Sequence, residues 1–298
     1  MMARMFLLIC CLTGVVARAE GTTPAPPPDP LFDEKPAPEL GWSGSARVGL
    51  DSEHTRQVEL GLDFPLEREL LASFEAGRSV STSEDGLVDT SSFGLELTAA
   101  PDSDLEGGVR YDYFGNTEEI RTHELTPSVT VRTDDWELTA SPGLRLVVTV
   151  VDRPLIGDTI TRSHLSYSVG GRARYLGWSP VFAGAFGTRY LYSRAIREDR
   201  LERSARIGAI SQTAFTVVSG ILDWNYGLSA GLELDAGSVE LSASTSRTFV
   251  SKADALAFAL AGEVALSDDW ALGPEVGRYL PEGSPPSTFG ALSVVYSW

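Results

Sequence analysis

The sequence predicts an all-β fold: an antiparallel, up-and-down transmembrane β-barrel of about fourteen strands over residues 41–298. Apolar and polar residues alternate with period two from Gly41 almost to the last residue. The alternating segments are about 9 to 13 residues long, the length that a tilted strand needs to cross a bilayer. Short and long polar connections alternate between them, as expected when one rim of a barrel carries tight turns and the other carries loops.

The first predicted strand shows the pattern that the later strands repeat. Residues 42–50 place Trp42, Val48 and Leu50 on one face, and Ser43 and Arg47 on the other. Segments 57–66, 105–113 and 164–175 divide in the same way. A soluble β-sandwich also alternates, but its strands are usually shorter, about 5 to 6 residues. Alternation alone does not say which face points inward, so the choice depends on the turns and the ends.

Turns and tryptophans mark one rim of the predicted barrel. The short connections lie at 102–104, 133–135, 235–237 and 267–269, and the longer ones at 78–90, 114–119, 152–162 and 281–287. Trp136 and Trp270 follow short turns, Trp178 lies in a third, and Trp42 and Trp298 lie at the two ends of the barrel. Tryptophan favours the interface between lipid and water, so these residues predict an aromatic girdle at the turn end.

The first forty residues differ from the rest. Arg4, an apolar run over 5–16 and the small-x-small site Ala17-Arg18-Ala19 predict a signal peptide over residues 1–19. Residues 20–40 are rich in proline, which removes backbone donors, and they predict an extended periplasmic leader. Both cysteines of the chain fall within the predicted signal peptide, so we expect no disulfide in the mature protein.

Composition excludes several classes of function. The chain has 298 residues, 24 of them basic and 41 acidic, which gives a formal net charge of −17. A nucleic-acid partner is not expected, because such a partner requires a basic face that neutralises phosphates. A mean hydropathy of −0.03 is too polar for a bundle of membrane helices.

The last strand carries a terminal pattern. Leu292, Val294, Tyr296 and Trp298 share one face, and Trp298 is the final residue. This segment resembles the terminal signal of Gram-negative outer-membrane β-barrels, a porin-like structural class rather than one family. The resemblance implies an outer-membrane location and implies that Tyr296 and Trp298 are recognised by the barrel-insertion machinery.

The strand number follows from a parity argument. The pattern gives nine strands over 41–193 and five over 226–298, and bacterial single-chain barrels have even counts. Residues 194–225 therefore hold either no barrel strand or two. We predict fourteen strands with 194–225 as a long outside excursion, and sixteen or twelve strands are the alternatives.

If the apolar faces meet lipid, the polar faces line the interior, where the charges divide by sign. An acidic wall is predicted from Glu59, Asp63, Glu75, Glu96, Glu106 and Asp112, and a basic wall from Arg145, Arg172, Arg174 and Arg189. Opposed walls of this kind favour a passive channel for small polar solutes, with the arginines attracting anions unless acids neutralise them. The alternative is a filled, mainly structural barrel in which these charges pair.

One motif raises an enzymatic alternative. His164 and Ser166 lie two residues apart, so both point to the same face of a strand. They resemble the His-x-Ser arrangement of outer-membrane phospholipases and lipid A deacylases, in which these side chains face the bilayer. Here the parity directs them into the interior, so we predict that the chain is not an enzyme.

Neither a cofactor nor a metal site is predicted, because the chain has only three histidines and no nucleotide-binding glycine loop. The predicted partners are outer-membrane lipid, lipopolysaccharide, the insertion machinery and small polar solutes. Acidic residues of the outside loops, Glu53 and Asp89 among them, are expected to be solvated loop charges, and a bridge to lipopolysaccharide through divalent cations is the alternative.

Overall fold

The computed structural model describes residues 41–298 except 68, 84–85, 102–103, 117–119, 154–157, 194–220, 235, 250–251 and 284. The predicted signal peptide and leader lie outside the described residues, as does most of the predicted excursion over 194–225. No helix in the described part of the chain is long and apolar enough to cross a bilayer.

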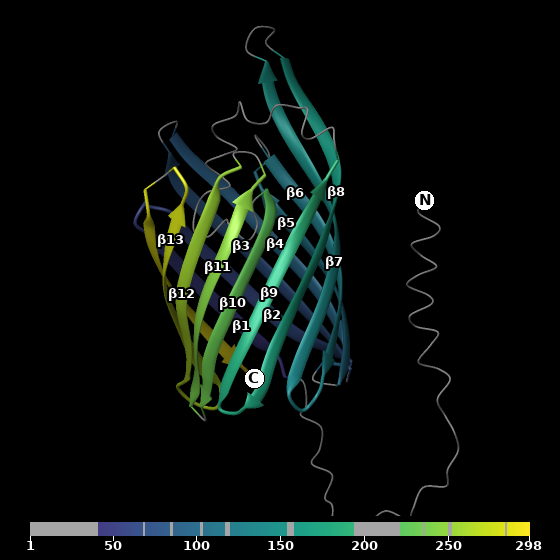
Figure 1. Cartoon of the computed structure of the whole chain (residues 1–298), viewed down its shortest axis with the longest axis vertical. Coiled ribbons are helices and arrows are strands. Elements are labelled where there is room, and N and C mark those ends of the chain that lie inside the picture. Colours follow the sequence, from purple (N-terminus) through teal and green to yellow (C-terminus); the bar gives the residue numbers. More distant parts are fainter. Residues whose placement is uncertain are drawn as a thin grey trace, which may run out of the picture. The chain divides into compact units, whose positions relative to one another are not determined.

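Fourteen strands form one closed antiparallel barrel (Figure 1). They are β1 (Ser43–Asp51), β2 (Arg56–Glu67), β3 (Leu70–Ser83), β4 (Gly86–Ala99), β5 (Leu105–Gly115), β6 (Ile120–Arg132), β7 (Trp136–Arg153), β8 (Asp158–Trp178), β9 (Val181–Tyr192), β10 (Leu222–Leu234), β11 (Gly237–Thr248), β12 (Asp254–Ala265), β13 (Trp270–Pro281) and β14 (Ser287–Ser297). Each strand pairs with its neighbours in sequence, and β1 pairs with β14 to close the barrel. The predicted fold class and strand number are confirmed, although β10 begins at Leu222, before the predicted residue 226.

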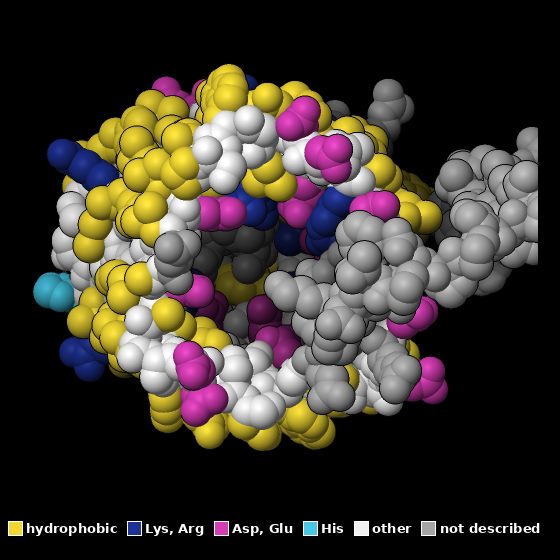
Figure 2. Space-filling model, turned by 90° about the horizontal axis from the view of Figure 1, so that it is seen from below, with side chains coloured by type: hydrophobic (Ala, Val, Ile, Leu, Met, Phe, Trp, Pro, Cys, Tyr) yellow, Lys and Arg dark blue, Asp and Glu magenta, His cyan; other side chains and the backbone are white. Residues whose placement is uncertain are grey.

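The outer face of the barrel is apolar. Val48 pairs with Val58 on one side and Leu292 on the other, and these side chains are 53%, 50% and 43% exposed. Large apolar side chains with such exposure continue from strand to strand around the molecule (Figure 2). A continuous apolar surface of this extent is not found on soluble monomers, because its contact with water is unfavourable.

The two rims differ, and we name them by their connections. The turn rim is the end at which β2–β3, β4–β5, β6–β7, β8–β9, β10–β11 and β12–β13 are joined, and the loop rim is the opposite end. At the turn rim, Thr133 Oγ1 accepts a hydrogen bond from the Trp136 amide at 3.1 Å, and Ser267 Oγ accepts one from the Trp270 amide at 3.2 Å. The alternation with period two thus begins at the residue after each of these turns.

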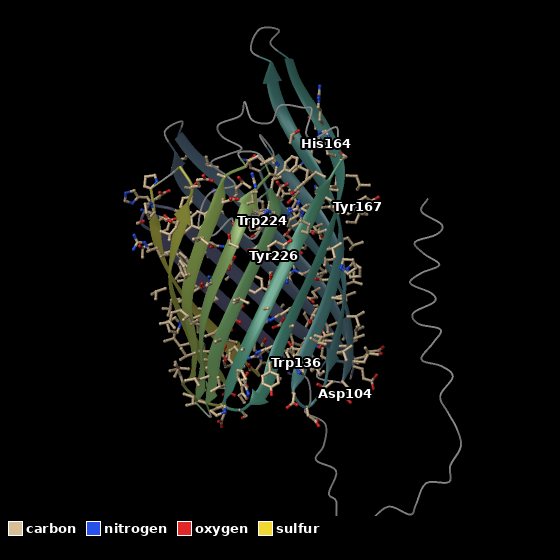
Figure 3. The ribbon with its side chains drawn as sticks, in the orientation of Figure 1. Asp104, Trp136, His164, Tyr167, Trp224 and Tyr226 are labelled. Carbon is tan, nitrogen blue, oxygen red and sulfur yellow. The ribbon has the colours of Figure 1, made fainter. Side chains whose placement is uncertain are left out.

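The predicted girdle tryptophans lie at the turn rim, where Figure 3 shows Trp136. Trp270 packs on Tyr296 with ring centroids 4.6 Å apart, and Tyr296 lies 5.4 Å from Trp298. Trp298 also stacks on Trp42 at 6.2 Å, and their backbones exchange two hydrogen bonds. The first and last residues of the barrel are therefore joined at this rim.

A buried apolar cluster lies inside the barrel near the loop rim. It consists of Val88, Phe114, Ile120, Val147, Tyr192, Ile221 and Phe249, each less than 9% exposed. Five of these residues lie in β4, β5, β6, β7 and β9, and Ile221 and Phe249 are next to β10 and β11. The buried apolar residues of this cluster therefore lie toward one end of the interior, whereas most of the exposed large apolar side chains lie on the outer face.

Candidate functional site

The interior is the candidate site, and its lining divides into two parts. We call the inward-facing side chains of β1–β8 the charged wall, because it holds every inward arginine between the rims among the described residues. We call the inward-facing side chains of β9–β14 the small-residue wall, because most of them are Gly, Ala or Ser. The inward side chains of β9 and β14, the outermost strands of this second wall, are all uncharged.

Arg110 of β5 is the centre of the largest ion-pair cluster in the charged wall. Its guanidinium lies 2.6 Å from Glu75, 3.4 Å from Glu96 and 2.8 Å from Asp112. Gly94 lies beside it, and a Cβ at that position would come within 3.0 Å of Arg110 Nη2. The absence of a side chain at Gly94 therefore leaves the space that the guanidinium occupies.

Two further arginines each form ion pairs with two carboxylates. Arg47 lies 3.1 Å from Glu59 on β2 and 2.5 Å from Glu275, which lies on β13 beyond the neutral strand β14. Arg132 lies 2.9 Å from Glu106 and 3.1 Å from Glu137. All of these side chains are 20–35% exposed, so the pairs retain contact with solvent and their net stabilisation is small.

Arg145 forms the most deeply buried ion pair. Its Nε lies 3.1 Å from Glu124 Oε2, and the two side chains are 3% and 13% exposed. Ser168 Oγ donates to Glu124 Oε1 at 2.7 Å, and the Arg145 guanidinium lies 4.7 Å from the Tyr190 ring centroid. Buried charges require such compensation, so this pair depends on both partners.

Arg174 and Arg172 follow one another on the inner face of β8 but have different surroundings. Arg174 lies 3.9 Å above the Phe182 ring of β9 and reaches Glu233 of β10 at 2.5 Å. Arg172 is exposed and takes part in no ion pair of the described residues. It is the inward arginine that can present its charge to a solute.

The structure corrects one predicted residue: Arg189 lies on the outer face. It pairs with Val169 of β8 and Trp224 of β10, and Val169 is 60% exposed on the apolar exterior. The inward positions of β9 are held instead by Phe182, Gly184, Phe186, Thr188, Tyr190 and Tyr192. The larger apolar side chains of this strand therefore point inward, which reverses the rule used to assign its faces.

The six predicted acidic residues all lie on the inner face, but they do not stand opposite a basic wall. Glu59, Glu75, Glu96, Glu106 and Asp112 pair with arginines of the same charged wall, and Asp63 accepts a hydrogen bond from Ser43 Oγ at 2.8 Å. The expected separation into acidic and basic walls is therefore wrong. The cause is that Arg47, Arg110 and Arg132 interleave with the acids on adjacent strands.

Several inward charges were not among the predicted site residues. They are Arg47, Arg110, Arg132, Glu124, Glu137, Glu233, Glu240, Glu263 and Glu275. The alternation already assigns these residues to the polar face, so the signal was present in the sequence. With them included, the inner face between the rims holds roughly twice as many carboxylates as guanidiniums.

The small-residue wall is shaped by aromatic rings that cover glycines. Phe182 of β9 lies over Gly231 of β10, and Phe186 lies over Gly227. A Cβ at either glycine would clash with the ring that covers it. These rings and glycines add apolar surface to a wall that also holds the inward-facing Glu233, Glu240, Glu263 and Glu275.

His164 and Ser166 do not form a lipid-facing site. Both side chains point inward and are 6% and 1% exposed, while Leu165 between them is 43% exposed on the outside. Ser166 Oγ donates to the Arg145 carbonyl oxygen at 3.1 Å. The hydroxyl therefore has a structural partner and lies away from any bilayer lipid.

Comparison with known proteins shows the fold. No family model and no curated relative matches the sequence. The structure is similar to the CymD monoaromatic hydrocarbon channel, with a TM-score of 0.53 at 7% identity over 87% of this chain and 89% of that one. It also matches the NanC porin, with a TM-score of 0.45 at 11% identity over 86% of this chain and 100% of that one. A loop-deletion mutant of OmpT, an outer membrane protein of Vibrio cholerae, has a TM-score of 0.45 at 9% identity, covering 86% of this chain and 98% of that one.

Proposed function

We propose that this chain is a bacterial outer-membrane channel through which small polar solutes diffuse passively. One observation carries the proposal: an apolar exterior surrounds an interior lined with charged and small side chains. Water stabilises the inner face and lipid the outer one, so the arrangement suits a water-filled barrel in a membrane.

The turn rim of the barrel would serve as the entrance for solutes. Seen from below, the barrel is hollowed at its centre, and acidic and basic side chains line the hollow (Figure 2). By their register, Arg172, which has no ion-pair partner among the described residues, and the partly exposed Arg110 cluster both face the interior. Solutes that enter would therefore meet hydrated charges before the apolar cluster near the loop rim.

The balance of inner charges favours cations. Arg145 and Arg174 are neutralised by Glu124 and Glu233, so the anion attraction expected from a row of arginines is largely cancelled. Glu240 and Glu263 take part in no ion pair of the described residues. An excess of carboxylates within a narrow, low-dielectric tube raises the local concentration of cations.

A planar-bilayer recording tests this function. Purified protein is added to one side of a bilayer under a KCl gradient, and we expect stepwise conductance with a reversal potential on the cation-selective side. Folded protein, identified by its heat-modifiable gel mobility, that inserts without conducting would contradict the channel.

A filled barrel is the second candidate, and the buried cluster around Phe114 favours it. Phe114→Ala removes a large inward ring from this cluster, whereas Phe93→Ala removes an outward ring from the adjacent strand β4. If the cluster only narrows an open path, Phe114→Ala raises an existing conductance and Phe93→Ala leaves it unchanged. If the cluster seals the barrel, conductance appears only in Phe114→Ala.

A further inference from the structure

The outer face near the loop rim carries arginines among its apolar residues. The arginines are Arg56, Arg78, Arg121, Arg189, Arg247 and Arg278, and their strand partners include the outward-facing Leu50, Val58, Val148, Val169, Trp224 and Phe258. Basic side chains project beyond the apolar surface in Figure 2. Nearer the turn rim, the outer face of the described strands holds neither Lys nor Arg.

Acids do not balance these arginines. Asp89 pairs with Arg78, and Asp254 lies 3.7 Å from Arg247. Arg56, Arg121, Arg189 and Arg278 take part in no ion pair of the described residues, in a chain whose net charge is −17. An isolated guanidinium at the edge of an apolar surface is stable only where water or an anion meets it.

The densest part of this surface lies on β9–β11. Trp224 pairs with Arg189 on one side and with Arg247 on the other, so the three residues are neighbours across adjacent strands on the outer face. Trp224 also stacks on Tyr226, with ring centroids 5.4 Å apart and planes at 25°. We call Arg189, Trp224 and Arg247 the outer arginine patch.

The height of the patch can be estimated from β10. Ten residues separate Leu234, at the turn rim, from Trp224, and Figure 3 shows Trp224 far from the rim marked by Trp136. At about 3.3 Å per residue and a tilt of about 40°, this stretch spans roughly 25 Å, the height of the apolar band of such barrels. The patch therefore lies at the membrane surface opposite the turn rim.

We propose that the outer arginine patch binds the phosphate of an anionic lipid in the outer leaflet, with the lipid's acyl chains along the apolar face below. A guanidinium group can donate two parallel hydrogen bonds to the oxygens of one phosphate. Trp224 packs against the same lipid at the level of its headgroup. The inference requires the outer-membrane placement proposed above, but not conduction.

Lipid binding in micelles tests this inference separately from channel activity. Purified wild-type protein in a neutral detergent is titrated with bisphosphorylated lipid A, and bound lipid is counted by native mass spectrometry. We expect saturable binding that phosphate-free lipid A with the same acyl chains does not reproduce and that millimolar inorganic phosphate does not displace. Equal binding of the phosphate-free lipid, or ready displacement by inorganic phosphate, would overturn the proposal.

Variants locate the site. Arg189→Gln with Arg247→Gln should weaken lipid A binding roughly 10- to 30-fold, because two basic groups near an anionic surface are lost. Arg172→Gln is the matched control, since it removes an unpaired arginine from the inner face. Unchanged binding in the double variant, or an equal loss in the control, would place the lipid elsewhere. Gel mobility checks the folding of each variant, and the comparison of the two lipids on wild type is independent of that check.

Discussion

The charged wall and the small-residue wall have the same exterior and different interiors. Outward residues are large and apolar on β1–β8 and on β10–β14 alike, because the same surroundings act on both. Inward, the first wall holds six arginines between the rims and most of the acids that pair with them, and the second holds mainly Gly, Ala, Ser and aromatic rings together with four glutamates. The apolar exterior is common to both walls, while the interior differs between them, and this difference would set the properties of the proposed channel.

The pairing across the boundaries shows how the two walls are joined. Arg47 on β1 reaches Glu275 on β13, and Arg174 on β8 reaches Glu233 on β10. The first ion pair crosses β14 and the second crosses β9, and neither of these strands has an inward-facing charge. The charged wall is therefore tied at both edges to the acids of the other wall.

The largest expected effect concerns the buried pair of the charged wall. Arg145→Ala leaves Glu124 charged and 13% exposed, and we expect a loss of about 3–5 kcal/mol in the free energy of unfolding. Urea titration followed by heat-modifiable gel mobility measures it. Arg172→Ala, in the same wall without an ion pair, should change the value by no more than about 0.5 kcal/mol. Equal losses in the two variants would show that the wall does not depend on pairing.

In the small-residue wall the expected effect comes from packing instead. Gly231→Ala places a methyl group against the Phe182 ring and the Val239 carbonyl oxygen, so we expect a loss of about 1–3 kcal/mol. The same urea titration applies. Gly107→Ala is the control, since a methyl group there would meet nothing within 4 Å. If both variants unfold as wild type does, the second wall is looser than its contacts indicate.

Where the walls meet at the β1–β14 junction, Trp298→Ala removes ring contacts with Trp42 and Tyr296 but keeps the backbone hydrogen bonds. We expect a stability loss of about 0.5–1.5 kcal/mol, the usual value for an aromatic pair. Assembly into membranes is measured separately, and we expect it to fall more than stability does. Unimpaired assembly would show that the terminal aromatic residue is not an insertion signal.

The smallest effect concerns selectivity. Arg172→Ser removes one positive charge from the lining, and a unit charge at about 8 Å in water is worth roughly 0.5 kcal/mol, or about two-fold in relative ion permeability. The reversal potential should shift toward the cation-selective side, by the amount that corresponds to this change in the permeability ratio. Arg278→Ser makes the same charge change on the outer face and should leave the reversal potential where it was. A shift in both variants would mean that the channel responds to net charge and not to its lining.

Much of this fold could be predicted because the outer face of most strands follows one simple rule, an apolar residue at every second position. The period of two, the spacing of the turns and the parity of the strands led to fourteen strands, as the structure has them. The rule failed at β9, where Phe182 and Tyr190 point inward and Arg189 points outward. The pairing of Arg189 with the outward-facing Val169 fixes the faces of β9, and the alternation within β9 does not give this register.

The site was harder to predict than the fold. That Glu59 and Arg110 face inward follows from parity, but which acid meets which arginine depends on the stagger between strands. Arg47 and Glu275 are far apart in sequence and meet only because the barrel closes. The apolar cluster near Phe114 was also missed, because inward apolar residues near the loop rim interrupt the alternation and resemble strand ends.

Closure of the barrel also gives the chain an uneven contact order. Thirteen of its strand pairings join neighbours in sequence, and the pairing of β1 with β14 joins residues such as Ser43 and Ser297. Local hairpins form with little loss of chain entropy, whereas this single pairing requires almost the whole barrel to be in place. Until it forms, both β1 and β14 are open edges with unpaired backbone groups, the kind of edge onto which another strand can add. The β1–β14 pairing is therefore the step at which a nearly folded chain either becomes a closed monomer or joins to a neighbour.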